Sequence, residues 1–182
     1  YGLLHCKTGD SNGGSSEVDG PMESEAEETL PHLVLEDLTF NYSMPNIIDI
    51  KMGTCTFEPT ATKKKKENEI KKYPYQSELG FRITGFKVFE RGSGMYIKSG
   101  KAFGRSVVPA EAVGALAMLF DDGTGVIRMD VLVALLDELE KLLVWVREQT
   151  QHRFFCSSLL IVYDALGNNS SQMPVSVEKD VV

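Results

Sequence analysis

The sequence predicts a mixed α and β domain of the α+β class, and three observations support this prediction. Short apolar or alternating segments, which are typical of strands, recur between residues 32 and 163. Residues 130–149 have the 3.6-residue periodicity of an amphipathic helix. The length of 182 residues suits about one domain, and a composition of 42% hydrophobic and 25% charged residues is ordinary soluble usage.

The predicted strands differ in how many of their side chains are expected to be buried. Residues 32–35 form an apolar run that predicts a buried strand, and residues 47–51 place alternate side chains on opposite faces. Residues 81–89 also alternate, and two glycines supply a turn before residues 95–98, so this region predicts a β-hairpin. Residues 154–163 are a nearly continuous apolar run, which predicts a central strand buried on both sides.

Three segments predict helices. Residues 63–73 are rich in helix formers, have little apolar face and are closed by Pro74. Residues 109–120 start with a proline, which is favoured in the first turn of a helix. The segment 130–149 is the longest, and its predicted apolar face consists of Val131, Leu135, Leu139, Leu142, Leu143 and Val146.

The predicted domain occupies residues 31–164, with less ordered segments on either side. Residues 1–30 are expected to be mostly disordered, because residues 17–28 carry six acidic and no basic side chains and few apolar ones. An acidic docking tail is the alternative interpretation of this segment. Residues 165–182 are polar and are also expected to be disordered.

Charge and cysteine usage exclude several classes of protein. A net charge of −7 argues against a general binder of nucleic acid or anionic membranes. The longest apolar run, residues 131–136, is far too short to span a bilayer, and nothing at the start resembles a secretory signal. Three scattered cysteines and three histidines exclude a disulfide framework or a standard zinc cluster, and we expect an intracellular protein of the nucleus or cytoplasm.

An acid and a lysine in the second strand segment form the first candidate site. Asp49 and Lys51 lie two residues apart, so they project from the same face of a strand, and Gly53 follows where the backbone needs freedom. Such a pair could hold a hydroxylated or phosphorylated ligand. The alternative is a surface ion pair of little energetic weight.

A lysine cluster lies just beyond that strand. Six lysines occur within residues 63–72, and on a helix Lys65 and Lys72 share a face with Asn68 and Glu69 between them. A concentrated positive charge in an acidic chain suits an anionic ligand such as a phosphate. A solvated helix face or a nuclear-localisation sequence is the alternative.

These segments resemble the inositol polyphosphate kinase family. Residues 45–53 match its PxxxDxKxG signature, residues 35–38 are similar to its hinge, residues 79–85 follow in order, and residues 157–160 resemble its SSLL strand. The runs at residues 72–74 and 103–106 look most like the multikinase branch of the family. The hexakisphosphate kinase and trisphosphate 3-kinase branches are the alternatives.

The resemblance implies an α+β, two-lobed fold with a protein-kinase-like ATP cleft, here incomplete at both ends. It implies ATP and inositol polyphosphates as substrates and Mg²⁺ as the cofactor, with no nucleic acid expected. The implied ATP-binding residues are Glu36 and Leu38 at the adenine edge and Asp49 at the ribose. Lys51 is implied to contact the reacting phosphate, so Lys51 and Asp49 are the candidate catalytic residues. The other implied substrate-binding residues are Lys65, Asn68, Glu69 and Lys72, of which Glu69 is unusual because it brings a carboxylate to a polyanion.

Two features of the family are not found in the sequence. Lys7 is the only lysine before Pro31, and it lies in a stretch without a convincing strand pattern. No Ile-Asp-Phe segment, which would supply the metal-binding carboxylate, occurs anywhere, so no metal ligand is assigned. We therefore expect either a partial sequence of an active kinase, with little turnover of its own, or a short form that binds inositol phosphates or a protein without catalysis.

Overall fold

The computed structural model describes residues 2–5, 31–167 and 176–179. The chain divides into two units, Tyr1–Asp37 and Leu38–Val182, and each is considered by itself. The acidic segment predicted to be disordered, residues 17–28, lies outside the described residues.

The first unit contains an antiparallel pair of strands. β1 (Gly2–His5) pairs with β2 (Pro31–Val34), with Gly2 opposite Val34. The sequence predicts β2 but not β1, whose four residues have no strand pattern of their own. The predicted burial is wrong for Val34 and Leu35, which are exposed. Two paired strands alone provide no second layer to cover their faces.

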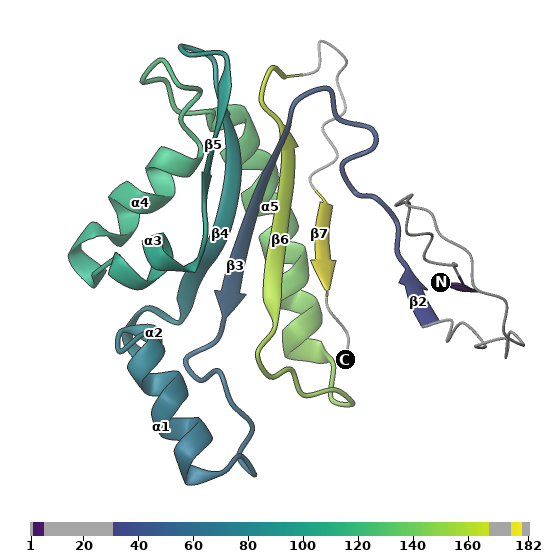
Figure 1. Cartoon of the computed structure of the whole chain (residues 1–182), viewed down its shortest axis with the longest axis vertical. Coiled ribbons are helices and arrows are strands. Elements are labelled where there is room, and N and C mark those ends of the chain that lie inside the picture. The colour runs from purple at the N-terminus through teal and green to yellow at the C-terminus, as the bar shows by residue number, and fades with distance from the viewer. Residues whose placement is uncertain (1, 6–30, 168–175, 180–182) are drawn as a thin grey trace, which may run out of the picture. The chain divides into compact units, whose positions relative to one another are not determined.

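The second unit is built on a five-stranded antiparallel sheet (Figure 1) in the order β5-β4-β3-β6-β7. Its strands are β3 (Pro45–Met52), β4 (Phe81–Glu90), β5 (Met95–Ser99), β6 (Ser158–Asp164) and β7 (Ser176–Lys179). The predicted hairpin is confirmed as β4 and β5, with Glu90 opposite Met95. The prediction of a disordered tail is wrong for residues 176–179, which form β7 and pair with β6.

The helices connect these strands. α1 (Lys63–Lys72) and α2 (Gln76–Leu79) link β3 to β4, and α3 (Lys101–Ser106) follows β5. A 3₁₀ turn (Pro109–Glu111) leads into α4 (Ala112–Leu119), and α5 (Met129–Glu148) precedes β6. The three predicted helices thus correspond to α1, to the 3₁₀ turn with α4, and to α5.

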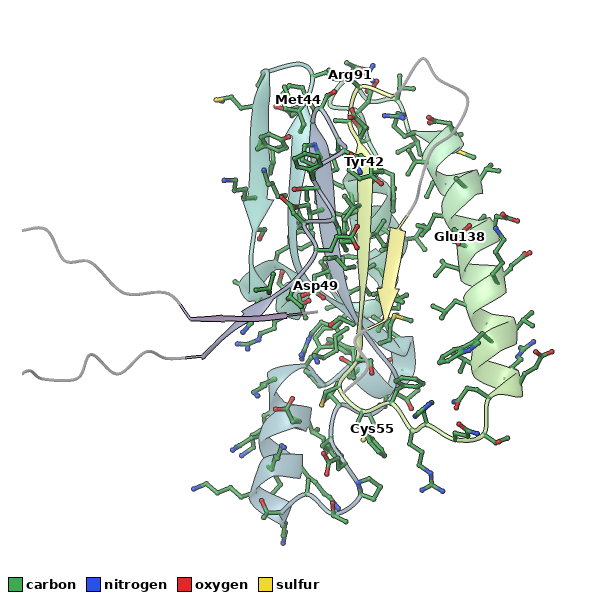
Figure 2. The ribbon with its side chains drawn as sticks, turned by 90° about the vertical axis from the view of Figure 1, so that its right-hand side faces the viewer. Tyr42, Met44, Asp49, Cys55, Arg91 and Glu138 are labelled. Carbon is green, nitrogen blue, oxygen red and sulfur yellow. The ribbon has the colours of Figure 1, made fainter. Side chains whose placement is uncertain are left out.

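The core lies between one face of the sheet and α5. Ile48 and Ile50 of β3 are buried in one cluster with Val131 and Leu135 of α5 and with Ile161 of β6. α5 runs behind the sheet in Figure 1 and forms a separate layer beside it in Figure 2. The predicted apolar face of α5 is buried only in its first half, because Leu143 and Val146 are exposed.

The strand predicted for residues 154–163 begins four residues later in the structure. β6 begins at Ser158, and Cys156 has a positive φ of 56°, which is unfavourable in an extended strand. β6 lies between β3 and β7, and its residues Ile161 to Asp164 are all buried. The central, two-sided strand is therefore confirmed for the second half of the run.

Candidate functional site

Asp49 and Lys51 lie on the same face of β3. Ile48 and Ile50 are buried in the core while Asp49 and Lys51 are partly exposed, which is the alternation that a strand imposes. One carboxylate oxygen of Asp49, Oδ1, is buried and has no hydrogen-bond partner among the described residues. A buried carboxylate oxygen without a partner is costly unless a ligand or water completes it.

Lys51 bonds to the loop before β6. Its Nζ donates a hydrogen bond to the backbone carbonyl oxygen of Cys156 at 2.6 Å. The surface ion pair between Asp49 and Lys51 that the spacing allowed is not formed.

α1 carries the lysine cluster beyond the end of β3 (Figure 1). The Thr62 hydroxyl accepts a hydrogen bond from the backbone N–H of Lys65, which caps the helix. No residue of α1 is buried, because the helix has little apolar face. It is anchored at its end by Tyr73, whose buried side chain donates a hydrogen bond to the carbonyl oxygen of Val107 at 2.7 Å.

A polar pocket of about 660 Å³ opens along α1. This volume is in the range of small-molecule sites. The pocket gathers four residues named by the sequence analysis and excludes Asp49 and Lys51 from its lining. Its lining consists of Thr62, Lys64, Lys65, Asn68, Glu69, Lys71, Lys72 and Arg105. Five cationic side chains against one carboxylate make it a strongly positive surface.

Glu69 is tied into this pocket by two partners. Its carboxylate forms an ion pair with Lys72 and accepts a hydrogen bond from the Thr56 hydroxyl at 3.3 Å. The hydrogen bond from Lys72 is the main reason that the pKa of Glu69 lies below its ordinary value, and burial opposes the shift. A carboxylate paired with a cation repels an anion less than an unpaired carboxylate does.

The segment from 55 to 57 connects the two candidate regions. The Cys156 thiol donates to the carbonyl oxygen of Thr56, and the Thr56 hydroxyl donates to Glu69. Lys51 is therefore linked to the Glu69–Lys72 pair through Cys156 and Thr56. Cys55, labelled in Figure 2, lies in this connecting segment beyond the end of the strand that holds Asp49.

Arg105 was not predicted as a site residue. It lies in the last turn of α3, near the end of the run 103–106, whose resemblance to the family concerns only the branch. Nothing in the local sequence of α3 indicates that it faces the lysines of α1. What places Arg105 beside α1 is the hydrogen bond between Tyr73 and Val107, which joins the ends of the two helices. These residues lie 34 apart in the sequence, so no local pattern indicates the contact.

No contact that the structure describes tests the adenine-binding role predicted for Glu36 and Leu38. Glu36 is exposed near the end of the first unit and Leu38, half-buried, begins the second. Their assignment to the adenine edge stays a prediction.

No group of three or more His, Cys, Asp or Glu side chains that could hold a metal ion occurs in the described part of the chain. Asp164, the last residue of β6, uses both carboxylate oxygens to accept backbone N–H groups, from Ser43 on one side and Leu166 on the other. In the same described ranges, no helix combines the length and apolarity needed to cross a membrane.

Known proteins resemble this chain in sequence. The sequence profile described as "Inositol polyphosphate kinase" matches residues 32–178. Human inositol polyphosphate multikinase is 33% identical over 133 residues, which is 73% of this chain and 32% of that protein. Mouse inositol hexakisphosphate kinase 3 is 34% identical over 134 residues, or 72% of this chain and 34% of that protein. The chain spans about a third of the length of these curated relatives.

Solved structures share the fold. A structure described as inositol phosphate multikinase matches with a TM-score of 0.68 and 25% identity, over 81% of this chain and 71% of that one. The multikinase of S. cerevisiae in complex with ADP and Mn²⁺ matches with a TM-score of 0.59 and 26% identity, over 74% of this chain and 60% of that one. With the α+β fold and the family profile in agreement, the chain belongs to the inositol polyphosphate kinase family.

Proposed function

We propose that this chain is part of an ATP-dependent kinase that converts inositol tris- and tetrakisphosphates to higher phosphates. The observation that carries the proposal is the positive pocket along α1, where Lys65 and Lys72 lie with three further cationic side chains. A ligand with several phosphates suits such a surface, because each phosphate can meet a separate cation. Membership of the family supports phosphoryl transfer as the reaction class.

The transfer joins a hydroxyl oxygen of the inositol ring to the γ-phosphorus of ATP. The bond from that phosphorus to the bridging oxygen breaks, ADP leaves, and the hydroxyl proton is released. Such a reaction asks the protein mainly to align the two substrates and to place cations at the transferred oxygens.

Lys51 is proposed to supply the cation at the reacting phosphate. Its ammonium carries three N–H donors, and the Cys156 carbonyl uses one of them. The bond to Cys156 can therefore orient the side chain while two donors remain for phosphate oxygens.

α1 is proposed to hold the phosphates that do not react. Lys65 and Lys72 act as cations, and Asn68 offers an amide donor in the same pocket. Glu69 is proposed to position Lys72 through their ion pair.

The ATP site is proposed to use the backbone of Glu36 and Leu38 for the adenine edge and Asp49 for the ribose. Mg²⁺ belongs to the reaction class, and a related structure was solved with ADP and Mn²⁺. The described residues do not form a site for it, since the unpaired Oδ1 of Asp49 is a single ligand and no metal-binding group surrounds it. No step is therefore assigned to the ion.

The branch of the family is proposed to be the multikinase, although multikinases and hexakisphosphate kinases match with similar identity. The substrate preference separates the branches, so the transfer assay should offer inositol trisphosphate, tetrakisphosphate and hexakisphosphate in parallel. Transfer to the hexakisphosphate alone would assign the chain to the other branch.

The experiment that tests the proposal combines binding and transfer. Calorimetric titration of inositol trisphosphate into the chain should show binding that is lost in the double variant Lys65→Ala, Lys72→Ala. The matched control, Lys98→Ala with Lys101→Ala, removes two exposed cations outside the pocket and should keep the binding. The chain alone is expected to have little turnover, so radiolabelled phosphate transfer from ATP should be measured in the longer kinase of which it is proposed to be part, where it separates a kinase from a module that only binds. Absence of inositol trisphosphate binding in the wild-type chain would contradict the proposal.

A further inference from the structure

The basic pocket contains one cation that does not come from the lysine helix. Arg105, on α3, lines the pocket opposite the cluster of α1. Its side chain is exposed, and its guanidinium makes no hydrogen bond or ion pair with any residue that the structure describes. Lys72, by contrast, shares its charge with Glu69.

Two contacts fix α3, and with it Arg105, relative to the pocket. Gly104 packs directly on β4, since a Cβ built at this residue would lie 1.6 Å from the carbonyl oxygen of Ile83. The buried Tyr73, one residue after Lys72, donates to the carbonyl of Val107, two residues after Arg105. Arg105 and Lys72 therefore lie near the joined ends of their two helices.

A guanidinium placed in this way recognises phosphate differently from a lysine. It is planar, keeps its charge at any accessible pH and offers two parallel N–H groups to two oxygens of one phosphate. The lysines of α1 act as point charges on flexible stems. A pocket that combines both can fix the orientation of a ring with several phosphates, whereas lysines alone attract anions with less geometric discrimination.

We infer that Arg105 is a substrate-binding residue that grips, with its guanidinium fork, a non-reacting phosphate of the inositol polyphosphate held along α1. The inference rests on the proposed function, because it assigns a further residue to the same ligand. It predicts that Arg105 contributes to affinity and orientation of the substrate and that it takes no part in the transfer itself.

The test compares Arg105→Ala, Arg105→Lys and the wild type by calorimetric titration with inositol trisphosphate. Loss of a charge-assisted bidentate contact should weaken binding about tenfold or more in Arg105→Ala, and Arg105→Lys should recover only part of it. Arg153→Ala, which removes an exposed arginine outside the pocket, should bind like the wild type. Where transfer is measurable, Arg105→Ala should raise KM with little change in kcat.

The outcomes distinguish this inference from the proposed function. If the wild type binds inositol trisphosphate and Arg105→Ala binds equally well, the assignment of Arg105 is wrong while the proposed function stands. Full recovery by Arg105→Lys would also overturn it, since a point charge would then suffice. If the wild type does not bind, the proposed function fails and the assignment of Arg105 fails with it. Thermal unfolding should show the same Tm for all variants, because the described residues offer Arg105 no partner whose loss would destabilise the fold.

Discussion

Lys51 of β3 donates a hydrogen bond to the backbone carbonyl of Cys156 at 2.6 Å, across the boundary between β3 and the loop that precedes β6. Cys156 has a left-handed backbone conformation, with φ at 56°. The lysine proposed to meet the reacting phosphate thus also holds the turn that leads into the SSLL strand. Its loss has two consequences, one for the ligand and one for the turn, which can be measured separately.

We predict that Lys51→Ala lowers phosphate transfer by orders of magnitude and costs only about 1 kcal/mol of unfolding free energy. The small cost follows because the bond to Cys156 is exposed and water can replace it. Transfer should be measured in the longer kinase of which this chain is proposed to be part, and stability by urea denaturation. Lys98→Ala is the control for loss of an exposed lysine on the same sheet. Near-normal transfer in Lys51→Ala would remove this lysine from the reaction.

Glu69→Gln is predicted to make the unfolding free energy less dependent on pH in the acid range. Folding lowers the pKa of Glu69 from 4.5, chiefly through the hydrogen bond from Lys72, so the carboxylate stabilises the folded chain above that pH. The stabilisation is lost as the pH falls through the lower pKa of the folded state. It should be at most about 1 kcal/mol, because the Lys72 side chain is 44% exposed and solvent screens the pair.

The measurement for Glu69 is the difference in unfolding free energy between the wild type and Glu69→Gln at a series of pH values. We expect a difference near neutral pH that declines once the pH falls below 4.5 and disappears below the lowered pKa of the folded state. Glu67→Gln, which removes the negative charge of an exposed carboxylate on the same helix, is the matched control variant. A difference that stays constant into acid would mean that the Glu69–Lys72 pair does not form in solution.

Much of the fold can be predicted from the sequence because its signals are local. Alternation along 81–89 and the glycine turn before Met95 specify the β4–β5 hairpin without reference to the rest of the chain. The periodicity of 130–149 does the same for α5. β1 and β7 were not predicted, because each has four residues and depends on pairing with a partner strand.

The part of the candidate site that was predicted also depends on a local signal, the spacing of residues along one helix. Lys65 and Lys72 share a helix face, so their spacing alone brings them together. The partner of Glu69, Thr56, lies 13 residues away and outside the helix, and the contact that positions Arg105 joins residues 34 apart. No local pattern encodes such contacts, since they depend on how the sheet packs against α1 and α3.

Gly104→Ala should destabilise the chain strongly, while Gly114→Ala should not. A Cβ at residue 104 would overlap the carbonyl oxygen of Ile83, so α3 would have to move off β4. We expect a cost of about 3 kcal/mol or more in urea denaturation. Gly114 lies in α4, where a Cβ would have nothing within 4 Å, and alanine there should stabilise by about 0.5 to 1 kcal/mol. Equal stability of the two variants would contradict the close packing of α3 on β4.

Tyr163→Phe is predicted to make the unfolding free energy of the chain less dependent on pH in the alkaline range. Tyr163 of β6 is buried, stacks on Phe120 and donates a hydrogen bond to the carbonyl of Leu119 at 2.6 Å. Burial raises its pKa to about 12, above the ordinary value of 10.0. The folded state therefore keeps the phenol proton when the unfolded chain has lost it, and the stabilisation present below pH 10 declines as the pH rises towards 12.

The readout is the unfolding free energy of the wild type minus that of Tyr163→Phe, measured by urea denaturation from neutral to alkaline pH. Near neutral pH the wild type should be more stable by about 1 kcal/mol, because the variant leaves the Leu119 carbonyl without its donor. Between pH 10 and 12 the wild type should lose roughly 2 kcal/mol relative to the variant, so that the difference reverses sign. If both proteins lost stability in parallel over that range, Tyr163 would have to ionise equally in the folded and unfolded chains, which its burial against Phe120 opposes.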